Sequence, residues 1–410
     1  MGKWDELYGA VEKPAPVPVL AGFNANIDRL VALTPSLLHD VREHAVSGEF
    51  LSRLIRSMRY CAADEFVVRD PSVFSRISAS VPPGTGTFAL GGQAAIAAVQ
   101  VHSLGMGPVT CVVPGAGPRT RGFLEEAGVL PLTFPETGEV PDTVHIIFEH
   151  SPGLVPLADR VVPRSNRFIV SPTHDSSTVL IPKSREEEFL KQIGNCRRAF
   201  LSGYQFLKTE EEFREAAEQI RAIRGVDSRM RTHVECVSGI SEAVLSFVLK
   251  HIFPVADSIG LNEQELDAFA RVLDPKKPDG IFISPMMIVR DALSLSRATG
   301  VPRLHLHTFG YYLAVLKPGT GTPESSRNGL LFAATEVAQA AGGDGLALAR
   351  EGLHAYADLR AELGLDKPQG VFTVGDRIVV FVPTLISQKV KKTTGLGDVL
   401  SSTAFVADGF

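Results

Sequence analysis

Cysteine is scarce in this chain, which contains four among 410 residues. The four stand far apart and form no CxxC pair, so neither a disulfide framework nor a cysteine-based metal site is predicted. Isolated cysteines are typical of buried thiols in a reducing compartment, and we expect a cytoplasmic protein. The four are Cys61, Cys111, Cys196 and Cys236.

Excess positive charge and long apolar runs are also missing. The chain has 41 lysines and arginines against 46 aspartates and glutamates, a net charge of −5. A nucleic-acid-binding protein needs a basic excess to replace counterions, so we expect no nucleic acid as partner. No apolar stretch is long enough to span a bilayer, and residues 1–6 lack the apolar run of a signal peptide. We therefore expect no membrane association.

What is present is a regular alternation of strand-like and helix-like segments. This alternation predicts an α/β fold with a central, mostly parallel sheet flanked by helices. Ligands of such sheets gather at the carboxyl ends of the strands, where this chain places polar and glycine residues. The expected strands are residues 17–23, 199–206, 232–237, 258–261 and 303–308, and the expected helices include residues 210–223 and 240–251.

Two regions, residues 67–90 and 140–171, do not follow this alternation of strands and helices. They contain short segments in which apolar and polar residues alternate, which is typical of half-buried antiparallel strands. We interpret them as a smaller β-rich layer that closes over a substrate. The alternative is extra edge strands of one large sheet. The expected lid domain comprises residues 28–89 and 139–174, and the expected large domain comprises residues 1–27, 90–138 and 175–410.

The segment 391–398, with the sequence KKTTGLGD, precedes an apolar stretch that predicts a helix. Gly395 and Gly397 allow a tight turn whose N–H groups approach an anion, and the positive end of the helix points to the same place. Asp398 would lie beside a developing negative charge, placed to take a proton from a hydroxyl nucleophile. The alternative is an N-cap aspartate after a glycine turn.

Two further motifs lie near the expected first strand. Asn26 and Asp28 alternate in the sequence GFNANID, so both side chains could face one pocket and bind sugar hydroxyls. An Asx-rich turn that caps a helix is an equal alternative. Gly91 and Gly92 open a small-residue helix, which suits close approach to a ligand but is better explained, on its own, by tight helix packing.

Carboxylates collect at two other strand ends. Asn262, Glu263 and Glu265 follow a strand and could hold Mg²⁺, directly or through water, although Asn262 and Glu265 also form a capping box. His233 and Glu235 share one face of another strand. A buried glutamate is uncommon without a cation or donor nearby, and a His–Glu pair that satisfies itself is the alternative.

The order of these motifs along the chain resembles that of the ribokinase-like sugar kinases. Their details, GFNANID, GGQAAI, HVE, NEQE and TTGLGD, are similar to the ADP-dependent glucokinase and phosphofructokinase family, as are residues 302–312 and 164–169. The resemblance covers nearly the whole chain. It implies a ribokinase-like fold with a lid, ADP as phosphoryl donor, AMP as product, and Mg²⁺ or another divalent cation as cofactor.

The resemblance also implies roles for individual residues. Asp398 would be the general base, and the backbone from Gly395 to Gly397 would form the anion hole. Other residues would bind the metal, the sugar and the nucleotide. The metal set is Glu235, Asn262, Glu263 and Glu265; the sugar set is Asn26, Asp28, Glu65, Gly92, Gln93, Arg164, Asn166, Arg167 and His174; the nucleotide set is His307, Thr308, Val390, Lys391 and Leu396.

The acceptor is predicted from two opposing signals. Arg164 and Arg167 stand where the family's phosphofructokinases place phosphate-binding arginines, whereas a carboxylate near Glu65 favours glucose, and the Asp64-Glu65 doublet leaves the register open by one. We expect a phosphofructokinase that converts fructose 6-phosphate to fructose 1,6-bisphosphate. A glucokinase, a bifunctional enzyme, an ATP-dependent ribokinase-type enzyme and a non-catalytic nucleotide-binding protein are the alternatives.

Overall fold

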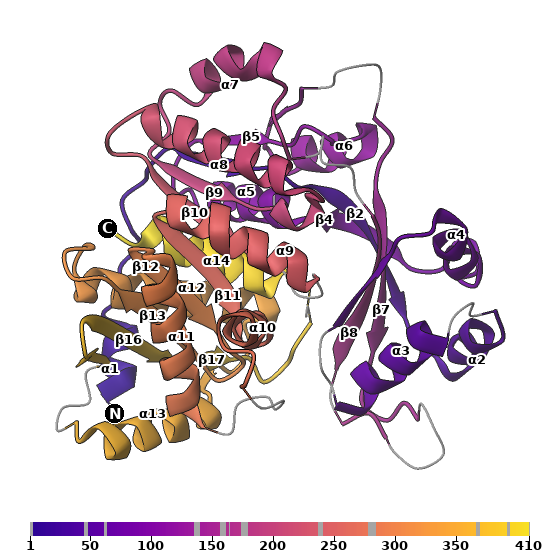
Figure 1. The fold of residues 1–410 in the computed structure, drawn as a ribbon. Helices are drawn as coiled ribbons and strands as arrows, with labels where there is room; N and C mark the ends of the chain where they lie inside the picture. The colour runs from indigo at the N-terminus through magenta and orange to yellow at the C-terminus, as the bar shows by residue number, and fades with distance from the viewer. Residues whose placement is uncertain are drawn as a thin grey trace.

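The computed structural model describes residues 3–44, 48–60, 64–134, 140–155, 161–163, 165–173, 179–236, 241–277, 284–365, 370–391 and 394–409. Within these residues the strands form a ten-stranded sheet, a separate five-stranded sheet and a two-stranded ribbon of β14 (Ala347–Leu348) and β17 (Leu385–Ile386). Figure 1 shows the two large sheets as distinct layers, each with its own helices. The alternative of extra edge strands in one large sheet is therefore wrong.

The ten-stranded sheet has a parallel part and an antiparallel edge. Its strand order is β15-β16-β13-β12-β11-β10-β9-β1-β5-β6, and the strands from β12 to β6 run parallel. The five predicted strands are all present, although residues 199–206 end in a 3₁₀ turn, Tyr204–Phe206. The strands are β1 (Val19–Gly22), β5 (Val109–Val112), β6 (Pro131–Leu132), β9 (Arg198–Leu201), β10 (Arg231–Glu235), β11 (Ser258–Asn262), β12 (Arg303–His307), β13 (Tyr311–Leu316), β15 (Val371–Val374) and β16 (Arg377–Pro383).

Helices cover both faces of this sheet. Along β13, Leu313 and Val315 belong to the core cluster of one face, while Ala314 and Leu316 belong to the cluster of the other, because side chains alternate along a strand. One face packs against α7 (Glu186–Gln192), α8 (Glu210–Gly225), α9 (Glu242–Phe247), α10 (Glu263–Leu273), α11 (Pro285–Thr299) and α13 (Arg350–Leu363). The other packs against α5 (Gln93–Ser103), α12 (Pro323–Ala341) and α14 (Leu396–Ala407). Two further α-helices, α1 (Lys3–Gly9) and α6 (Pro118–Glu126), belong to this part of the chain.

The five-stranded sheet is covered by helices on one face. Its core cluster centres on Phe50, whose ring packs edge-on against Phe66 and Phe168. The strand order is β3-β8-β7-β2-β4. The elements are β2 (Asn26–Ala32), α2 (Pro35–His44), α3 (Gly48–Tyr60), β3 (Asp64–Val68), α4 (Pro71–Ala79), β4 (Thr87–Gly91), β7 (Val144–His150) and β8 (Asn166–Pro172).

Two details of the predicted β-rich layer are wrong. Residues 71–79 form α4, which begins with an N-cap from Asp70 and a proline at its first turn. Two of the four strand pairings, β2–β7 and β3–β8, are parallel and not antiparallel. The layer itself is confirmed, while the domain boundaries drawn from the sequence stay a prediction.

The chain passes between the two sheets at a few short connections. β1 leads into β2 through residues 23–25, and β4 leads into α5 at Gly92. These connections bring the carboxyl end of the large sheet next to the uncovered face of the small one (Figure 1). No helix among the described residues is long and apolar enough to cross a membrane.

Candidate active site

A cavity lies between the two sheets and collects most of the predicted site residues. On the large sheet, Glu235, Asn262 and His307 are the last residues of the neighbouring strands β10, β11 and β12. The small sheet contributes side chains from its uncovered face. The lining residues are Asn24, Asn26, Asp28, Asp64, Glu65, Gly92, Gln93, Ile96, His145, Ile147, Arg167, Ile169, Gln205, Phe206, Glu235, Cys236, Asn262, Glu265, His307, Thr394, Gly395, Gly397 and Asp398.

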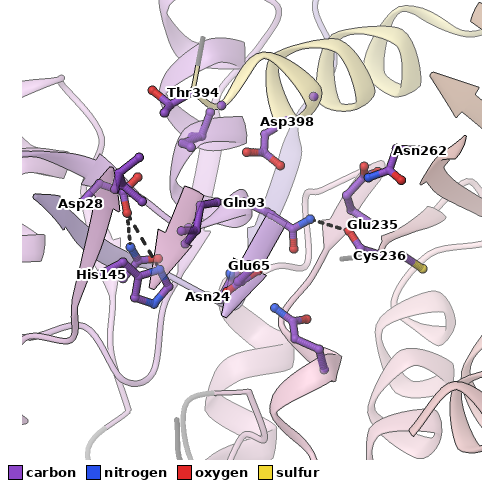
Figure 2. A pocket seen from close by; sticks show the side chains of 18 of the residues that line it. Asn24, Asp28, Glu65, Gln93, His145, Glu235, Cys236, Asn262, Thr394 and Asp398 are labelled. Carbon is purple, nitrogen blue, oxygen red and sulfur yellow. Dashed lines mark hydrogen bonds and ion pairs between the residues drawn. The ribbon is translucent and has the colours of Figure 1, made fainter. Parts of the chain in front are cut away.

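The first turn of α14 borders this cavity. Gly395 is the N-cap with φ of 70°, and a Cβ there would lie 3.0 Å from Ile96 Cδ1, so this turn needs glycine. Asp398 is the third residue of the helix, so the alternative of an N-cap aspartate is wrong. Figure 2 shows its carboxylate pointing into the cavity. A carboxylate and the positive end of a helix therefore meet at one point.

Asn26 and Asp28 lie on the cavity side of β2. Asn26 Nδ2 donates a hydrogen bond of 2.7 Å to Asp28 Oδ1, and His145 Nδ1 on β7 lies 4.0 Å from the same oxygen. A Cβ on Gly91 would lie 2.3 Å from Asp28 Oδ1, so glycine is required beside this carboxylate. Because residues 26–32 form a strand, the alternative of a helix-capping turn is wrong.

Gly92 and Gln93 begin α5 at the same cavity. Gly92 has φ of 88°, and a Cβ there would lie 2.6 Å from Ala25 Cα, which supports the tight packing inferred from the sequence. Gln93 Nε2 donates to the Cys236 carbonyl at 2.7 Å (Figure 2). This bond connects α5 to the residue that follows β10.

The neighbouring carboxylates of Asp64 and Glu65 have different hydrogen-bond partners. Arg53 Nε donates to Asp64 Oδ2 at 3.0 Å, whereas Ser171 Oγ donates to Glu65 Oε1 at 2.6 Å. Burial raises the pKa of Glu65, and the serine bond opposes part of that rise. Both residues line the cavity, and the Asp64 carboxylate forms an ion pair with Arg53 of α3, which lies outside the lining.

Arg167 is the arginine in the cavity lining. Burial lowers the pKa of its guanidinium, while the carboxylates of Asp398, Asp28, Glu149 and Glu65 act to raise it. These carboxylates include Asp398 on α14 and residues of the small sheet. Arg167 therefore interacts electrostatically with both sides of the cavity.

Glu235 lies at the end of β10 and is held by two donors. His233 Nε2 is 3.0 Å from Glu235 Oε2, and Ser401 Oγ of α14 donates to Glu235 Oε1 at 3.0 Å. Burial, together with the charges of Glu265 and Asp398, raises the pKa of Glu235. Burial lowers the pKa of His233. The predicted His–Glu pair is present.

Asn262 and Glu265 form the predicted capping box at the start of α10. Asn262 Oδ1 accepts from the N–H of Gln264 and Glu265 at 2.9 Å each, and Glu265 Oε2 accepts from Asn262 N–H at 2.7 Å. Both residues also line the cavity, whereas Glu263 does not.

The donor set fits a magnesium ion held through water. Figure 2 shows Glu235, Asn262 and Asp398 in one part of the cavity, and Glu265 also lines the cavity. No group of three His, Cys, Asp or Glu side chains within the described ranges is arranged to ligate a metal directly. Each carboxylate oxygen of Glu235 already accepts one bond and keeps a second lone pair. Mg²⁺ usually retains several waters, which suits such a site.

Some predicted residues lie outside the cavity lining. Thr308 Oγ1 donates to the Tyr311 carbonyl at 2.8 Å, Lys391 Nζ lies 3.5 Å from Asp344 Oδ2, and Val390 is exposed. Leu396 packs against the core of α12 and α14, and Asn166 Oδ1 accepts from Arg167 N–H. Arg164 and His174 lie outside the described residues. The nucleotide and sugar roles of all these residues remain predictions.

Several lining residues were missed in the sequence. Gln205 and Phe206 follow β9, where the strand-end rule could have found them, and His145 alternates with Ile147 on a strand that was predicted. Asn24 lies inside the GFNANID motif, where its Oδ1 accepts from Ser202 Oγ at 2.6 Å. Cys236 was expected to be buried but is partly exposed at the cavity, whereas Cys111 and Cys196 are buried as expected.

The fold is the predicted ribokinase-like one, a large and mostly parallel α/β sheet flanked by helices, with a separate β-rich layer beside its strand ends. The conserved-region model of the ADP-specific phosphofructokinase/glucokinase family matches residues 17–407. The chain therefore belongs to this family and is an ADP-dependent sugar kinase, as the resemblance implied.

Individual relatives are similar over their full lengths. An ADP-dependent glucose/glucosamine kinase of Pyrococcus furiosus is 29% identical, with 100% of this chain and 99% of the relative covered. An ADP-specific phosphofructokinase of Pyrococcus abyssi is 26% identical, with 96% and 97% covered. A solved ADP-dependent kinase in complex with fructose 6-phosphate and ADPβS has a TM-score of 0.84 at 24% identity over 98% of this chain and 96% of that chain, which shows the shared fold.

Proposed function

We propose that this enzyme transfers the β-phosphoryl group of ADP to a hydroxyl of a hexose and that glucose is its preferred acceptor. The observation that carries the acceptor choice is the Glu65 carboxylate inside a strongly acidic cavity. Six carboxylates stand among the described lining residues against one lining guanidinium, Arg167, and one of the six, Asp64, is paired with Arg53. The carboxylates are Asp28, Asp64, Glu65, Glu235, Glu265 and Asp398.

Charge favours a neutral sugar at the small-sheet side of this cavity. The hydroxyls of glucose can donate to Asp28 and Glu65, whereas the dianion of fructose 6-phosphate would be repelled by them. The name of the Pyrococcus furiosus relative is consistent with this choice. It reverses the order of preference inferred from the sequence, which put fructose 6-phosphate first.

Fructose 6-phosphate stays the second candidate because of Arg167. A guanidinium can donate two hydrogen bonds to a phosphate, and Arg167 lies in the cavity as the phosphofructokinase prediction requires. The solved relative with bound fructose 6-phosphate is consistent with this alternative. The product would then be fructose 1,6-bisphosphate.

In the proposed reaction Asp398 accepts the proton of the sugar hydroxyl. The hydroxyl oxygen forms a bond to the β-phosphorus while the bond from that phosphorus to the bridging oxygen breaks, and AMP leaves with the electron pair. The N–H groups of the first turn of α14 stabilise the negative charge on the transferred group. When bound, Mg²⁺ neutralises phosphate charge, and Glu235, Asn262 and Glu265 would hold it through water.

We also propose that the two sheets belong to two domains that close over the substrates. Support comes from the separate cores of the two sheets and from the few connections between them. Closure would bring Glu65 and Arg167 over the acceptor and exclude water, which protects ADP from hydrolysis.

A donor and acceptor matrix tests this function. The purified enzyme is incubated with Mg²⁺ and either ADP or ATP, together with glucose or fructose 6-phosphate, and AMP and sugar phosphates are quantified by ³¹P NMR. We expect AMP and glucose 6-phosphate from ADP and glucose. Robust turnover of fructose 6-phosphate with none of glucose would overturn the acceptor choice, and an absence of AMP with every acceptor would overturn the activity.

A further inference from the structure

Three neighbouring parallel strands carry polar side chains on a buried face. A parallel sheet that is covered on both faces normally presents apolar residues on both of them. Ile259, Leu304 and Leu306 follow that rule on one face of β11 and β12. The opposite face carries polar residues that are at most 3% exposed, and these are His233, Glu235, Ser258, Arg303 and His305.

These side chains form a continuous hydrogen-bonded chain that runs from the cavity, at the carboxyl ends of the strands, to the amino-terminal ends of β11 and β12. Glu235 Oε2 is 3.0 Å from His233 Nε2, and His233 Nδ1 is 2.8 Å from Ser258 Oγ. Arg303 Nη1 donates to Ser258 Oγ at 3.0 Å, and Arg303 Nε donates to Asp408 Oδ2 at 2.8 Å. His233, Ser258 and Arg303 are direct neighbours across the three strands.

Between Arg303 and Glu235, all hydrogen bonds of this series are donated in the same direction. A guanidinium only donates, so Ser258 Oγ accepts from Arg303 and its own hydrogen is available for His233 Nδ1. Because Nδ1 of His233 then accepts from Ser258, its ring carries hydrogen on Nε2 and donates it to Glu235. Between Arg303 and the cavity, each donor thus points toward the Glu235 carboxylate, while Arg303 Nε donates in the other direction, to Asp408.

The residues packed around His233 and Glu235 leave space for this pair and hold the His233 ring in place. A Cβ on Gly260 of β11 would lie 1.9 Å from Glu235 Oε2 and 2.8 Å from His233 Nε2, so the glycine leaves the space that the pair occupies. The His233 ring is stacked between Phe200 and Phe405, with centroids 5.3 and 5.0 Å away. The ring therefore cannot rotate without displacing aromatic neighbours.

The hydrogen-bonded chain also fixes helix α14 at two points. Ser401 in the middle of the helix donates to Glu235, and Asp408, its C-cap residue, accepts from Arg303. Asp398 belongs to the first turn of the same helix. Removal of the Ser258 hydroxyl leaves both of these bonds in place, so it acts on the Glu235 carboxylate through His233 and not on the helix.

We propose that Ser258 and Arg303 are positioning residues that orient the Glu235 carboxylate toward the divalent cation of the ADP complex. This inference rests on the proposed function, because it requires Glu235 to hold that cation. Neither residue lines the cavity. They act through His233, as partners of metal-site ligands commonly do.

The substitution Ser258→Ala tests the proposal, because it removes the hydroxyl between Arg303 and His233 and little else. ADP binding is measured by calorimetry without sugar, once with MgCl₂ and once with EDTA. We expect about tenfold weaker binding with Mg²⁺, by analogy with other partners of metal ligands, and unchanged binding in EDTA. An equal loss in both conditions would overturn the proposal, since it would indicate general damage to the nucleotide site.

Ser296→Ala is the matched control. Ser296 is as buried as Ser258 and accepts a hydrogen bond of 3.2 Å from the buried Arg377, away from the cavity. We expect similar melting temperatures for the two variants and wild-type ADP binding for Ser296→Ala. Wild-type Mg²⁺-dependent binding by a folded Ser258→Ala variant would overturn the inference and leave the proposed function standing. If wild-type enzyme binds ADP equally with and without Mg²⁺, the metal assignment fails with it.

A spectroscopic measurement tests the direction in which the hydrogen bonds are donated. Two-dimensional ¹H–¹⁵N NMR of the histidine rings reports which nitrogen carries hydrogen, and His233→Gln identifies the signal. We expect His233 as the neutral Nε2–H form in wild-type enzyme and a shifted Nδ1 signal in Ser258→Ala. A ring with hydrogen on Nδ1 in the wild-type enzyme would overturn the proposed orientation of Glu235.

Discussion

The two sheets contribute to the cavity in different ways. The large sheet presents the last residues of strands, such as Glu235 and Asn262, and the first turn of α14, all within a layer covered on both faces. The small sheet presents residues along its uncovered face, such as Asp28, Glu65 and Arg167. Strand ends in a doubly covered sheet are held rigidly, whereas a sheet covered on one face can approach and leave as a layer.

This difference suggests that the two sheets have different roles in the reaction. The rigid side would supply the phosphoryl-transfer groups, and the small sheet would select the acceptor and exclude water. Substitutions on the large-sheet side should then lower kcat, whereas those on the small sheet should change KM in a manner that depends on the acceptor.

The largest effect is expected for Asp398→Asn on the large-sheet side. The amide keeps the size of the side chain but cannot accept the proton, so kcat should fall about 10²–10⁴-fold. Binding of ADP and of sugar, measured by calorimetry, should stay largely intact. A variant that keeps more than a small fraction of wild-type kcat would show that Asp398 is not the base.

The next effect is expected for Glu65→Gln on the small sheet. Loss of a charged acceptor for sugar hydroxyls should lower kcat/KM for glucose about 10- to 100-fold, the equivalent of a hydrogen bond to a charged group. The value for fructose 6-phosphate should change less, because removing a negative charge offsets the lost bond. Steady-state kinetics with both sugars measure this, and an equal loss for both would contradict selection by Glu65.

A smaller effect is expected for Arg167→Ala. Its guanidinium faces several carboxylates, so only part of its charge is available to a substrate phosphate. KM for fructose 6-phosphate should rise about tenfold, more than KM for glucose. Arg76→Ala on α4, which is exposed and away from the cavity, is the control. A larger rise for glucose than for fructose 6-phosphate would rule out a phosphate-binding role.

The smallest change is expected in the shape of the molecule. Closure of the two domains should decrease the radius of gyration in small-angle scattering when a non-hydrolysable ADP analogue and sugar are added together. Each ligand added alone is the control for partial closure. An unchanged radius under saturating ligands would argue that the small sheet is fixed in place.

Much of the fold follows from local patterns in the sequence. The strands at β10, β11 and β12 were found because apolar runs end in polar residues, and α8 was found by its helical spacing. The region of residues 67–90 was misjudged at α4, whose hydrophobic face is partial and packs on the small sheet. Short segments of that kind are decided by tertiary packing and not by local preference.

The sequence by itself determined the motifs, their order and hence which groups stand at the first turn of α14. Gly395, Gly397 and Asp398 stand within four residues, so local geometry alone brings them together. The sequence could not determine which of the Asp64 and Glu65 carboxylates is paired with an arginine. Nor could it determine that Ser258, Arg303 and Asp408 are connected to Glu235 by hydrogen bonds that run through His233 to the other end of the strands. These contacts join residues far apart in the chain, and they exist only because neighbouring strands and a covering helix enforce them at distances of a few ångströms.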